Sequence, residues 1–196
     1  MKNIFSFVLM MSFFTVSAQV PDNRLSIGTI DSLYSAILKE YRKIWIYIPD
    51  GHTRNKGLHY PVVYLLDGES HFYSVAGMIQ QLSEINGNTV CPQMVVIAIL
   101  NTDRTRDLTP THVLHGIYGR YETSGGAENF TGFIGKELMP YIEAHYPVAP
   151  YRTLIGHSFG GLFVINTLIN HTDMFNAYIA IDPSLWWDNQ KLMKQG

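Results

Sequence analysis

The segment from Tyr151 to Phe163 reads YRTLIGHSFGGLF and contains a serine with a glycine two residues away on each side. The apolar residues before the first glycine predict a strand, and the apolar run that continues to Asn170 predicts a helix. A serine on a sharp strand-to-helix turn is the setting of a nucleophile elbow, in which the glycines let strand and helix approach closely. The same residues also fit a serine that only caps the helix, so the pentapeptide alone leaves both interpretations open.

On either side of this turn, short apolar runs alternate with longer segments of helical spacing. Strands are predicted at residues 45–49, 62–66, 94–100, 153–155 and 177–182, and helices at 72–85, 128–145 and 160–170. Asp67-Gly68 predicts a turn, and residues 101–112 a long polar loop. The runs at 62–66 and 94–100 are typical of strands buried on both faces. This order predicts an α/β fold with a doubly wound, mostly parallel sheet.

Composition limits the classes of function. The chain has 196 residues, 46% of them hydrophobic and 15% charged, and its formal net charge is −2. These values fit one globular domain, and without a basic run nothing favours nucleic acid or an anionic membrane surface as a partner. Cys91 is the only cysteine, which excludes an internal disulfide and a cysteine-cluster zinc site, and we expect its role to be structural. The sequence implies no metal and no cofactor.

Residues 1–18 have the organisation of a secretory signal peptide. Lys2 precedes an apolar run from Ile4 to Val16, and Ala18 is the small residue before the expected cleavage site. The run is shorter than the about 20 residues that span a bilayer, which disfavours the alternative of an uncleaved membrane anchor. We therefore expect cleavage after Ala18 and export of residues 19–196 to a periplasm or to the cell exterior.

Three further segments accompany the serine turn: SAILKEYRKIWIYIPD at 35–50, YPVVYLLDGE at 60–69 and IAIDPSLWWDN at 179–189. Together with GHSFGG and the polar loop, they resemble the putative esterase family of α/β-hydrolases over almost the whole chain. That family includes ferric-siderophore (enterobactin-type) esterases, esterase D, feruloyl and acetyl-xylan esterases and mycolyltransferases. The resemblance implies an α/β-hydrolase fold and a serine carboxylic-ester hydrolase in which Ser158 is the nucleophile.

The resemblance also assigns an oxyanion hole. In this fold the oxyanion is held by the amide after the nucleophile and by an amide after the third strand, here the N–H groups of Phe159 and Glu69. The Glu69 side chain is then expected to turn to solvent. Arg104 lies in a segment that reaches the mouth of the site in similar esterases. It could bind an anionic or carbonyl-rich substrate, or it could hold its own loop through Asp103 or Asp107.

Two adjacent tryptophans follow the strand predicted at 177–182, at the sheet edge where the serine lies. Trp186 and Trp187 could form flat walls for aryl or acyl groups of a substrate, and core packing of at least one of them is an equal alternative. His157 precedes the serine, so its side chain points away from Ser158, and we expect a packing or hydrogen-bonding role for it.

A serine hydroxyl needs a base, and in α/β-hydrolases the triad follows the chain order Ser, Asp or Glu, His. His171 is the only histidine after Ser158. A helical rise of about 1.5 Å per residue places it roughly 20 Å from the nucleophile, so it is excluded as the base. His71 follows the oxyanion loop, but chain order argues against it. Asp182 is a candidate acid, although similar proteins more often supply the acid later.

We therefore expect residues 19–196 to be an α/β-hydrolase domain whose C-terminal strands and catalytic histidine are missing. The leading hypothesis is an exported serine esterase acting on a siderophore-type trilactone, a feruloyl or acetyl ester of a polysaccharide, or a smaller ester. The alternative is a non-catalytic hydrolase-like binding protein or a decayed copy.

Overall fold

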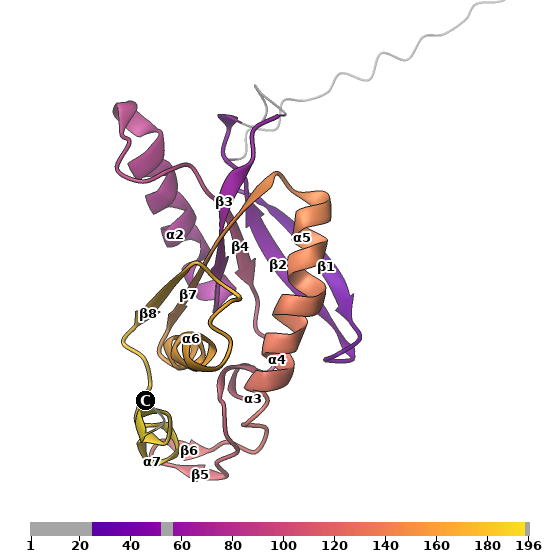
Figure 1. Cartoon of the computed structure of the whole chain (residues 1–196), viewed down its shortest axis with the longest axis vertical. Coiled ribbons are helices and arrows are strands. Elements are labelled where there is room, and N and C mark those ends of the chain that lie inside the picture. The colour runs from indigo at the N-terminus through magenta and orange to yellow at the C-terminus, as the bar shows by residue number, and fades with distance from the viewer. Residues whose placement is uncertain (1–24, 52–56, 195–196) are drawn as a thin grey trace, which may run out of the picture.

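The structure, a computed structural model, describes residues 25–51 and 57–194, so the predicted signal peptide lies outside the described residues. A six-stranded sheet forms its centre, in the order β1-β2-β4-β3-β7-β8 (Figure 1). The strands are β1 (Thr29–Ser35), β2 (Glu40–Tyr47), β3 (Tyr60–Leu65), β4 (Val95–Ile99), β7 (Val148–His157) and β8 (Ala177–Ile181). Neighbours among β4, β3, β7 and β8 are parallel, whereas β1 and β2 extend the sheet in antiparallel pairing. The predicted mostly parallel sheet is confirmed.

Helices cover both faces of this sheet. The main helices are α2 (Gly68–Ser83), α4 (Ala127–Phe133), α5 (Met139–His145) and α6 (Phe159–Asn170), and a π-helical segment, Ile134–Leu138, joins α4 to α5. Shorter elements are α3 (Arg104–Leu108), α7 (Trp187–Gln190), 3-10 turns at Ile85–Gly87 and Leu192–Lys194, and the hairpin of β5 (His115–Gly116) and β6 (Gly119–Arg120). The helix predicted at 128–145 is confirmed as the continuous α4–π–α5 segment.

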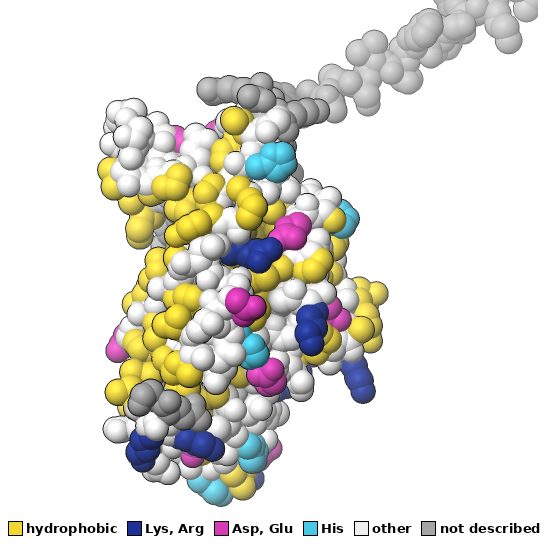
Figure 2. All heavy atoms as spheres, in the orientation of Figure 1, with side chains coloured by type: hydrophobic (Ala, Val, Ile, Leu, Met, Phe, Trp, Pro, Cys, Tyr) yellow, Lys and Arg dark blue, Asp and Glu magenta, His cyan; other side chains and the backbone are white. Residues whose placement is uncertain are grey.

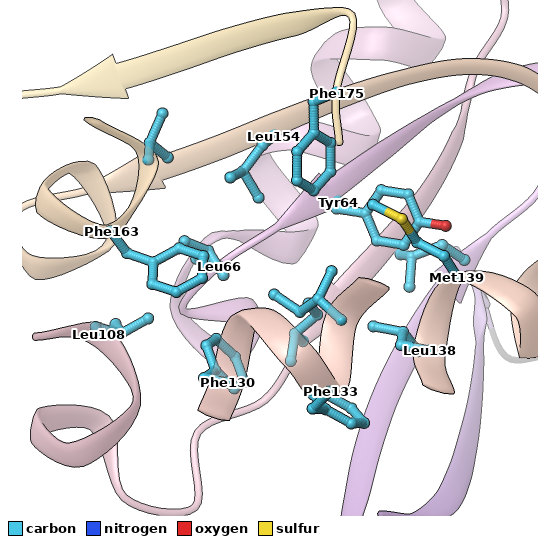
Figure 3. Close-up of a cluster of buried hydrophobic side chains, with 14 of the residues drawn as sticks. Tyr64, Leu66, Leu108, Phe130, Phe133, Leu138, Met139, Leu154, Phe163 and Phe175 are labelled. Carbon is cyan, nitrogen blue, oxygen red and sulfur yellow. The ribbon is translucent and has the colours of Figure 1, made fainter. Parts of the chain in front are cut away.

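Alternate residues of the buried strands pack into two separate hydrophobic cores, one on each face of the sheet. Val63 and Leu65 of β3 pack with α2 residues such as Phe72, while Val62 and Tyr64 face the larger core under α4, α5 and α6. Figure 3 shows that larger core, with aromatic and aliphatic side chains of the sheet and helices meeting between them. Burial on both faces is the reason that β3 and β4 are continuously apolar in sequence, because neither face of these strands contacts water.

The start of α2 differs from the sequence prediction. The helix was expected from Phe72, after an Asp67-Gly68 turn, but it begins at Gly68. Asp67 adopts a left-handed conformation (φ 52°, ψ 47°), and only two residues separate the end of β3 from the start of the helix. A Cβ on Gly68 would lie 2.9 Å from the Ala98 carbonyl carbon, so only glycine lets α2 begin this close to β4.

Two other elements were missed. β1 was not predicted, and β2 begins at Glu40 rather than at Trp45, because this antiparallel edge carries polar and exposed residues that weaken the apolar signal. The segment predicted as a loop at 101–112 contains α3. Its first turn is capped by Asp103, whose side chain accepts a hydrogen bond from the Arg106 amide at 3.0 Å.

A buried ion-pair network fixes α3 against β2. Arg42 is fully buried and donates to Asp107 at 2.6 Å and to Glu40 at 2.8 Å. Arg106 donates to the same two carboxylates, at 2.7 Å to Asp107 and 2.6 Å to Glu40. The Arg42 guanidinium also lies over the Phe130 ring, 5.1 Å from its centroid. This network holds α3, and therefore its first residue, Arg104, in one position relative to the sheet.

Candidate active site

Ser158 lies at the turn between β7 and α6, and its backbone is in an unusual conformation for a residue with a side chain. Its φ is 57° and its ψ is −114°. The turn is held by the Ser158 amide, which donates to the Ile181 carbonyl at 3.1 Å, and by the Ser158 carbonyl, which accepts from the amides of Leu162 and Ser184 at 2.9 and 3.0 Å. A backbone of this kind costs on the order of 1–3 kcal/mol and persists only where the surroundings impose it.

The structure rules out helix capping as the role of the Ser158 side chain. The hydroxyl makes no capping hydrogen bond to α6, and its Oγ lies instead 3.2 Å from the Ser184 Oγ. It therefore faces a pocket rather than the helix amides.

The glycines around the serine are required by close packing. A Cβ on Gly156 would lie 2.4 Å from the carbonyl carbon and oxygen of Gly160, and one on Gly161 would lie 2.9 Å from the Pro183 Cα. A Cβ on Gly160 would lie 3.1 Å from an Asp67 carboxylate oxygen. The expected close approach of strand and helix is therefore confirmed, and the same packing sets the start of α2 beside the start of α6.

The two backbone amides expected to hold an oxyanion lie in these first helical turns. Phe159 is the first residue of α6, and Glu69 is in the first turn of α2. Such amides have no partner inside the helix, and no acceptor within the described ranges is hydrogen-bonded to either. The helix dipole adds partial positive charge at both helix starts. Each of these two amides is therefore available to donate to a negatively charged oxygen.

The Glu69 side chain is exposed, as expected, but it is not free. Its carboxylate accepts hydrogen bonds from the backbone amide of Asn101 at 3.2 Å and from the Asn101 side chain at 2.8 Å. The same Asn101 amide group donates to Asp67 at 2.8 Å. These bonds fix the loop after β4 to the start of α2.

Arg104 has a partner that the sequence reasoning did not consider. Its guanidinium donates to both carboxylate oxygens of Asp67, at 2.6 and 2.9 Å, and lies over the Phe159 ring, 5.2 Å from the centroid. The proposed contacts with Asp103 and Asp107 are wrong, because Asp103 caps α3 and Asp107 pairs with two other arginines. The Arg104 side chain is 36% exposed, so it reaches solvent beside the nucleophile.

A pocket of about 390 Å³ opens beside the serine. It is lined by Tyr118, Tyr121, Ser158, Phe159, Asp182, Pro183, Ser184 and Trp186. Tyr118 is at the tip of the β5–β6 hairpin and packs edge-on against Trp186, with ring centroids 5.1 Å apart. Both tyrosines were missed in the sequence. The turn residues around Ile117 and Tyr118 signal a hairpin, but not that it folds over the serine.

The two tryptophans have different environments. Trp187 is 2% exposed, packs against Phe159 and Tyr121, and donates from its indole N–H to Thr111 at 3.1 Å. Trp186 is half-buried and lines the pocket. One tryptophan therefore packs in the core while the other is available to a ligand.

Three of the histidines bear on the search for a catalytic base. His171 is at the opposite end of α6 from Ser158 and is 3.0 Å from a Glu128 carboxylate oxygen, which agrees with its exclusion as the base. His157 and His71 pack edge to face, with ring centroids 5.7 Å apart. Within residues 25–51 and 57–194, no histidine is hydrogen-bonded to Ser158.

Asp182 directly follows β8, is exposed and lines the pocket, with a left-handed backbone (φ 42°). Asp182 therefore lines the same pocket as Ser158, but within the described part of the chain no hydrogen bond or ion pair joins its carboxylate to a histidine.

Comparison with known proteins identifies the family. The model of the family described as "Putative esterase" matches residues 35–195. The chain belongs to this esterase family. It is 32% identical to the ferri-bacillibactin esterase BesA of Bacillus subtilis over 169 residues, which cover 80% of this chain and 58% of that protein. It is 31% identical to a siderophore enterobactin esterase of Emericella nidulans over 148 residues, 68% of this chain and 49% of that protein.

The solved structure of an IroE-like serine hydrolase from Shewanella oneidensis is similar as well. It is 39% identical, with a TM-score of 0.80, and the match covers 86% of this chain and 55% of that one. The predicted α/β-hydrolase fold is thereby confirmed. The chain spans only about half to three fifths of the length of these relatives. No helix of the described residues is long and apolar enough to cross a membrane.

Proposed function

We propose that this esterase is an exported serine hydrolase that cleaves carboxylic esters through an acyl-enzyme at Ser158. The observation that carries the proposal is the Ser158 backbone, which is held at a positive φ on a strand-to-helix turn while its hydroxyl faces a pocket. Neither packing nor helix capping requires a serine in this conformation. A strained residue of this kind is found where function demands it.

The proposed reaction uses groups at the starts of two helices. The Ser158 Oγ attacks the ester carbonyl carbon as its proton passes to a base, and the carbonyl oxygen becomes an oxyanion held by the amides of Phe159 and Glu69. The tetrahedral intermediate then collapses: the C–O bond to the alcohol breaks, and the alcohol leaves with the proton from the base. Water attacks the acyl-enzyme in the same way, which releases the acid and restores Ser158. This chemistry needs neither a metal nor a cofactor.

We further propose that the base belongs to polypeptide beyond the described residues, and that 19–196 is an incomplete hydrolase domain. The share of the relatives' length that is covered supports this, as does the outer edge of the sheet. Ile179 and Ile181 of β8 are exposed, and Figure 2 shows hydrophobic side chains gathered along the side of the molecule that carries β8. A further strand on β8 would bury them.

The proposed substrates are esters of siderophores or other small molecules that carry flat acyl groups. The similarity to siderophore esterases of Bacillus subtilis and Emericella nidulans supports siderophore esters. The aromatic wall of Tyr118 and Trp186 suits an aryl group, and Arg104 offers a cation beside the pocket for an anionic or carbonyl-rich substrate. Feruloyl and acetyl esters of polysaccharides are the competing substrates.

The test uses the full-length protein that contains these residues. We expect hydrolysis of p-nitrophenyl esters, and we expect Ser158→Ala to lower kcat/KM by at least about a thousandfold. Ser74→Ala, which changes an exposed serine on α2, is the matched control and should leave the rate unchanged. Activity retained by Ser158→Ala would overturn the assignment of the nucleophile.

The alternative, a hydrolase-like binding protein, is motivated by the absence of a histidine bonded to Ser158 in the described residues. It predicts saturable binding of a siderophore ester with no release of acid. Chromatography of the siderophore after incubation separates the two functions, because only an esterase produces the linear hydrolysis products.

A further inference from the structure

Ser184 is a buried residue whose hydroxyl contacts the nucleophile. It follows Pro183 in the loop after β8 and is 5% exposed. Its Oγ lies 3.2 Å from the Ser158 Oγ, and this is its only side-chain hydrogen bond with a described residue. A buried hydroxyl is costly unless it is hydrogen-bonded, so the pairing of these two side chains is the state that the loop favours.

The position of Ser184 is fixed by backbone contacts that do not involve its hydroxyl. Its amide donates to the Ser158 carbonyl at 3.0 Å, and its carbonyl accepts from the Trp187 amide at 3.1 Å. The preceding Pro183 is so close to the first turn of α6 that a Cβ on Gly161 would lie 2.9 Å from the Pro183 Cα. These contacts hold the loop against the turn that carries Ser158, and the Ser184 hydroxyl therefore lies beside the nucleophile.

An ordinary local role does not explain this hydroxyl. Serine side chains in loops commonly bond to backbone groups a few residues away, as turns or helix caps. The Ser184 hydroxyl makes no such bond to the turn that leads into α7; the bond between Ser184 and Trp187 joins backbone groups only. The hydroxyl is directed across the chain to the nucleophile, 26 residues away in sequence.

We propose that Ser184 is a positioning residue, whose hydroxyl holds the Ser158 Oγ in the pocket and donates a hydrogen bond to that oxygen during catalysis. This inference rests on the proposed function of Ser158. While Ser158 carries its own proton, either oxygen can be the donor. Once that proton has passed to the base, only Ser184 can donate between the two, so its bond to the attacking oxygen strengthens as charge develops there.

The same bond would act again when the acyl-enzyme is hydrolysed. Water attacks the acyl carbon, the bond from that carbon to the Ser158 Oγ breaks, and the electron pair stays on Oγ until the base returns a proton. Donation from Ser184 stabilises the leaving oxygen in this step. Both steps therefore depend on the Ser184 hydroxyl, so loss of this hydroxyl should act mainly on kcat rather than on KM.

The experiment compares Ser184→Ala and Ser184→Thr in the full-length protein, with Ser158→Ala measured in parallel. The alanine variant removes only the hydroxyl, because the backbone amide that supports the elbow remains. We expect kcat for a p-nitrophenyl ester to fall about tenfold with KM unchanged, the effect of losing one ordinary hydrogen bond, and threonine, which retains a hydroxyl, to restore kcat to within about threefold. Urea unfolding midpoints, measured on all variants, report any loss of the fold separately.

Three results would overturn the inference, and they are distinguishable from one another. If Ser158→Ala is inactive but Ser184→Ala keeps its kcat within twofold, the positioning role is wrong and the nucleophile stands. If alanine and threonine lower kcat equally at unchanged unfolding midpoints, the hydroxyl is not the group that matters. If Ser158→Ala remains active, the proposed function fails, and Ser184 then has no nucleophile to position.

Discussion

Gly156→Ala tests the close packing on which the serine turn depends. The added Cβ would lie 2.4 Å from the carbonyl carbon and oxygen of Gly160 and 2.9 Å from its Cα. Non-bonded carbon atoms are normally about 3.5–4.0 Å apart, so β7 and α6 would have to separate by about 1 Å. All of these atoms are backbone, and no side chain can rotate to relieve the contact.

The expected cost follows from that displacement. Overpacking a well-packed interior typically costs about 1–3 kcal/mol, and a clash with rigid backbone belongs at the upper end, so we expect a loss of about 3 kcal/mol in the free energy of unfolding. A displacement of about 1 Å at the nucleophile should also lower the rate of ester hydrolysis by about a hundredfold.

Urea unfolding followed by tryptophan fluorescence measures the stability change. Gly77→Ala in α2 is the matched control, because a Cβ there would meet nothing within 4 Å. Alanine is favoured over glycine inside a helix, so the control should gain about 0.5–1 kcal/mol. If Gly156→Ala unfolds within about 0.5 kcal/mol of the parent, the argument from close approach is wrong.

Three further predictions concern charge and specificity. The hydrogen bond from Arg106 lowers the pKa of Glu40, so the stability contributed by this carboxylate is present above the pKa of an unfolded glutamate, about 4, and is lost as pH falls through its lower folded value. The urea unfolding midpoint of the parent protein should therefore be lower at pH 3 than at pH 7, and Glu40→Gln should make this difference smaller. A difference as large as that of the parent would contradict the role of Glu40. Arg104→Lys should lower kcat/KM about tenfold, because lysine cannot hold both oxygens of Asp67, and a steady-state assay showing wild-type activity would refute it. Tyr118→Ala should raise KM several-fold for an aryl-acyl ester but not for the acetyl ester of the same alcohol. An equal rise in KM for both esters would show that Tyr118 and Trp186 do not bind the aryl group.

The parts of the fold that the sequence predicts well are those with a strong local signal. The runs at 62–66 and 94–100 are apolar throughout because β3 and β4 are buried on both faces. The serine turn can be predicted because its glycines and its serine lie within five consecutive residues. β1 and the start of α2 could not be predicted, because neither an exposed edge strand nor a left-handed Asp67 produces a distinctive sequence pattern.

The site was less predictable than the fold, because its contacts join distant segments. Asp67 and Arg104, Ser158 and Ser184, and Tyr118 and Trp186 meet only when the strands are placed in register. No local sequence pattern indicates which carboxylate an arginine will pair with. Trp186 was placed near the serine because it follows a predicted strand at the same edge of the sheet, whereas Arg104 was placed there only by the resemblance to a family.

The most direct test of Ser158 as the nucleophile is to locate the residue that reacts with an active-site-directed phosphonylating reagent. The full-length protein would be exposed briefly to a fluorophosphonate, a reagent that modifies activated serines, and then examined by intact-mass spectrometry and peptide mapping. We expect one adduct per molecule, carried by the peptide that contains Ser158, and none on the Ser158→Ala variant. An adduct on another residue, or equal modification of that variant, would contradict the claim that Ser158 is the nucleophile.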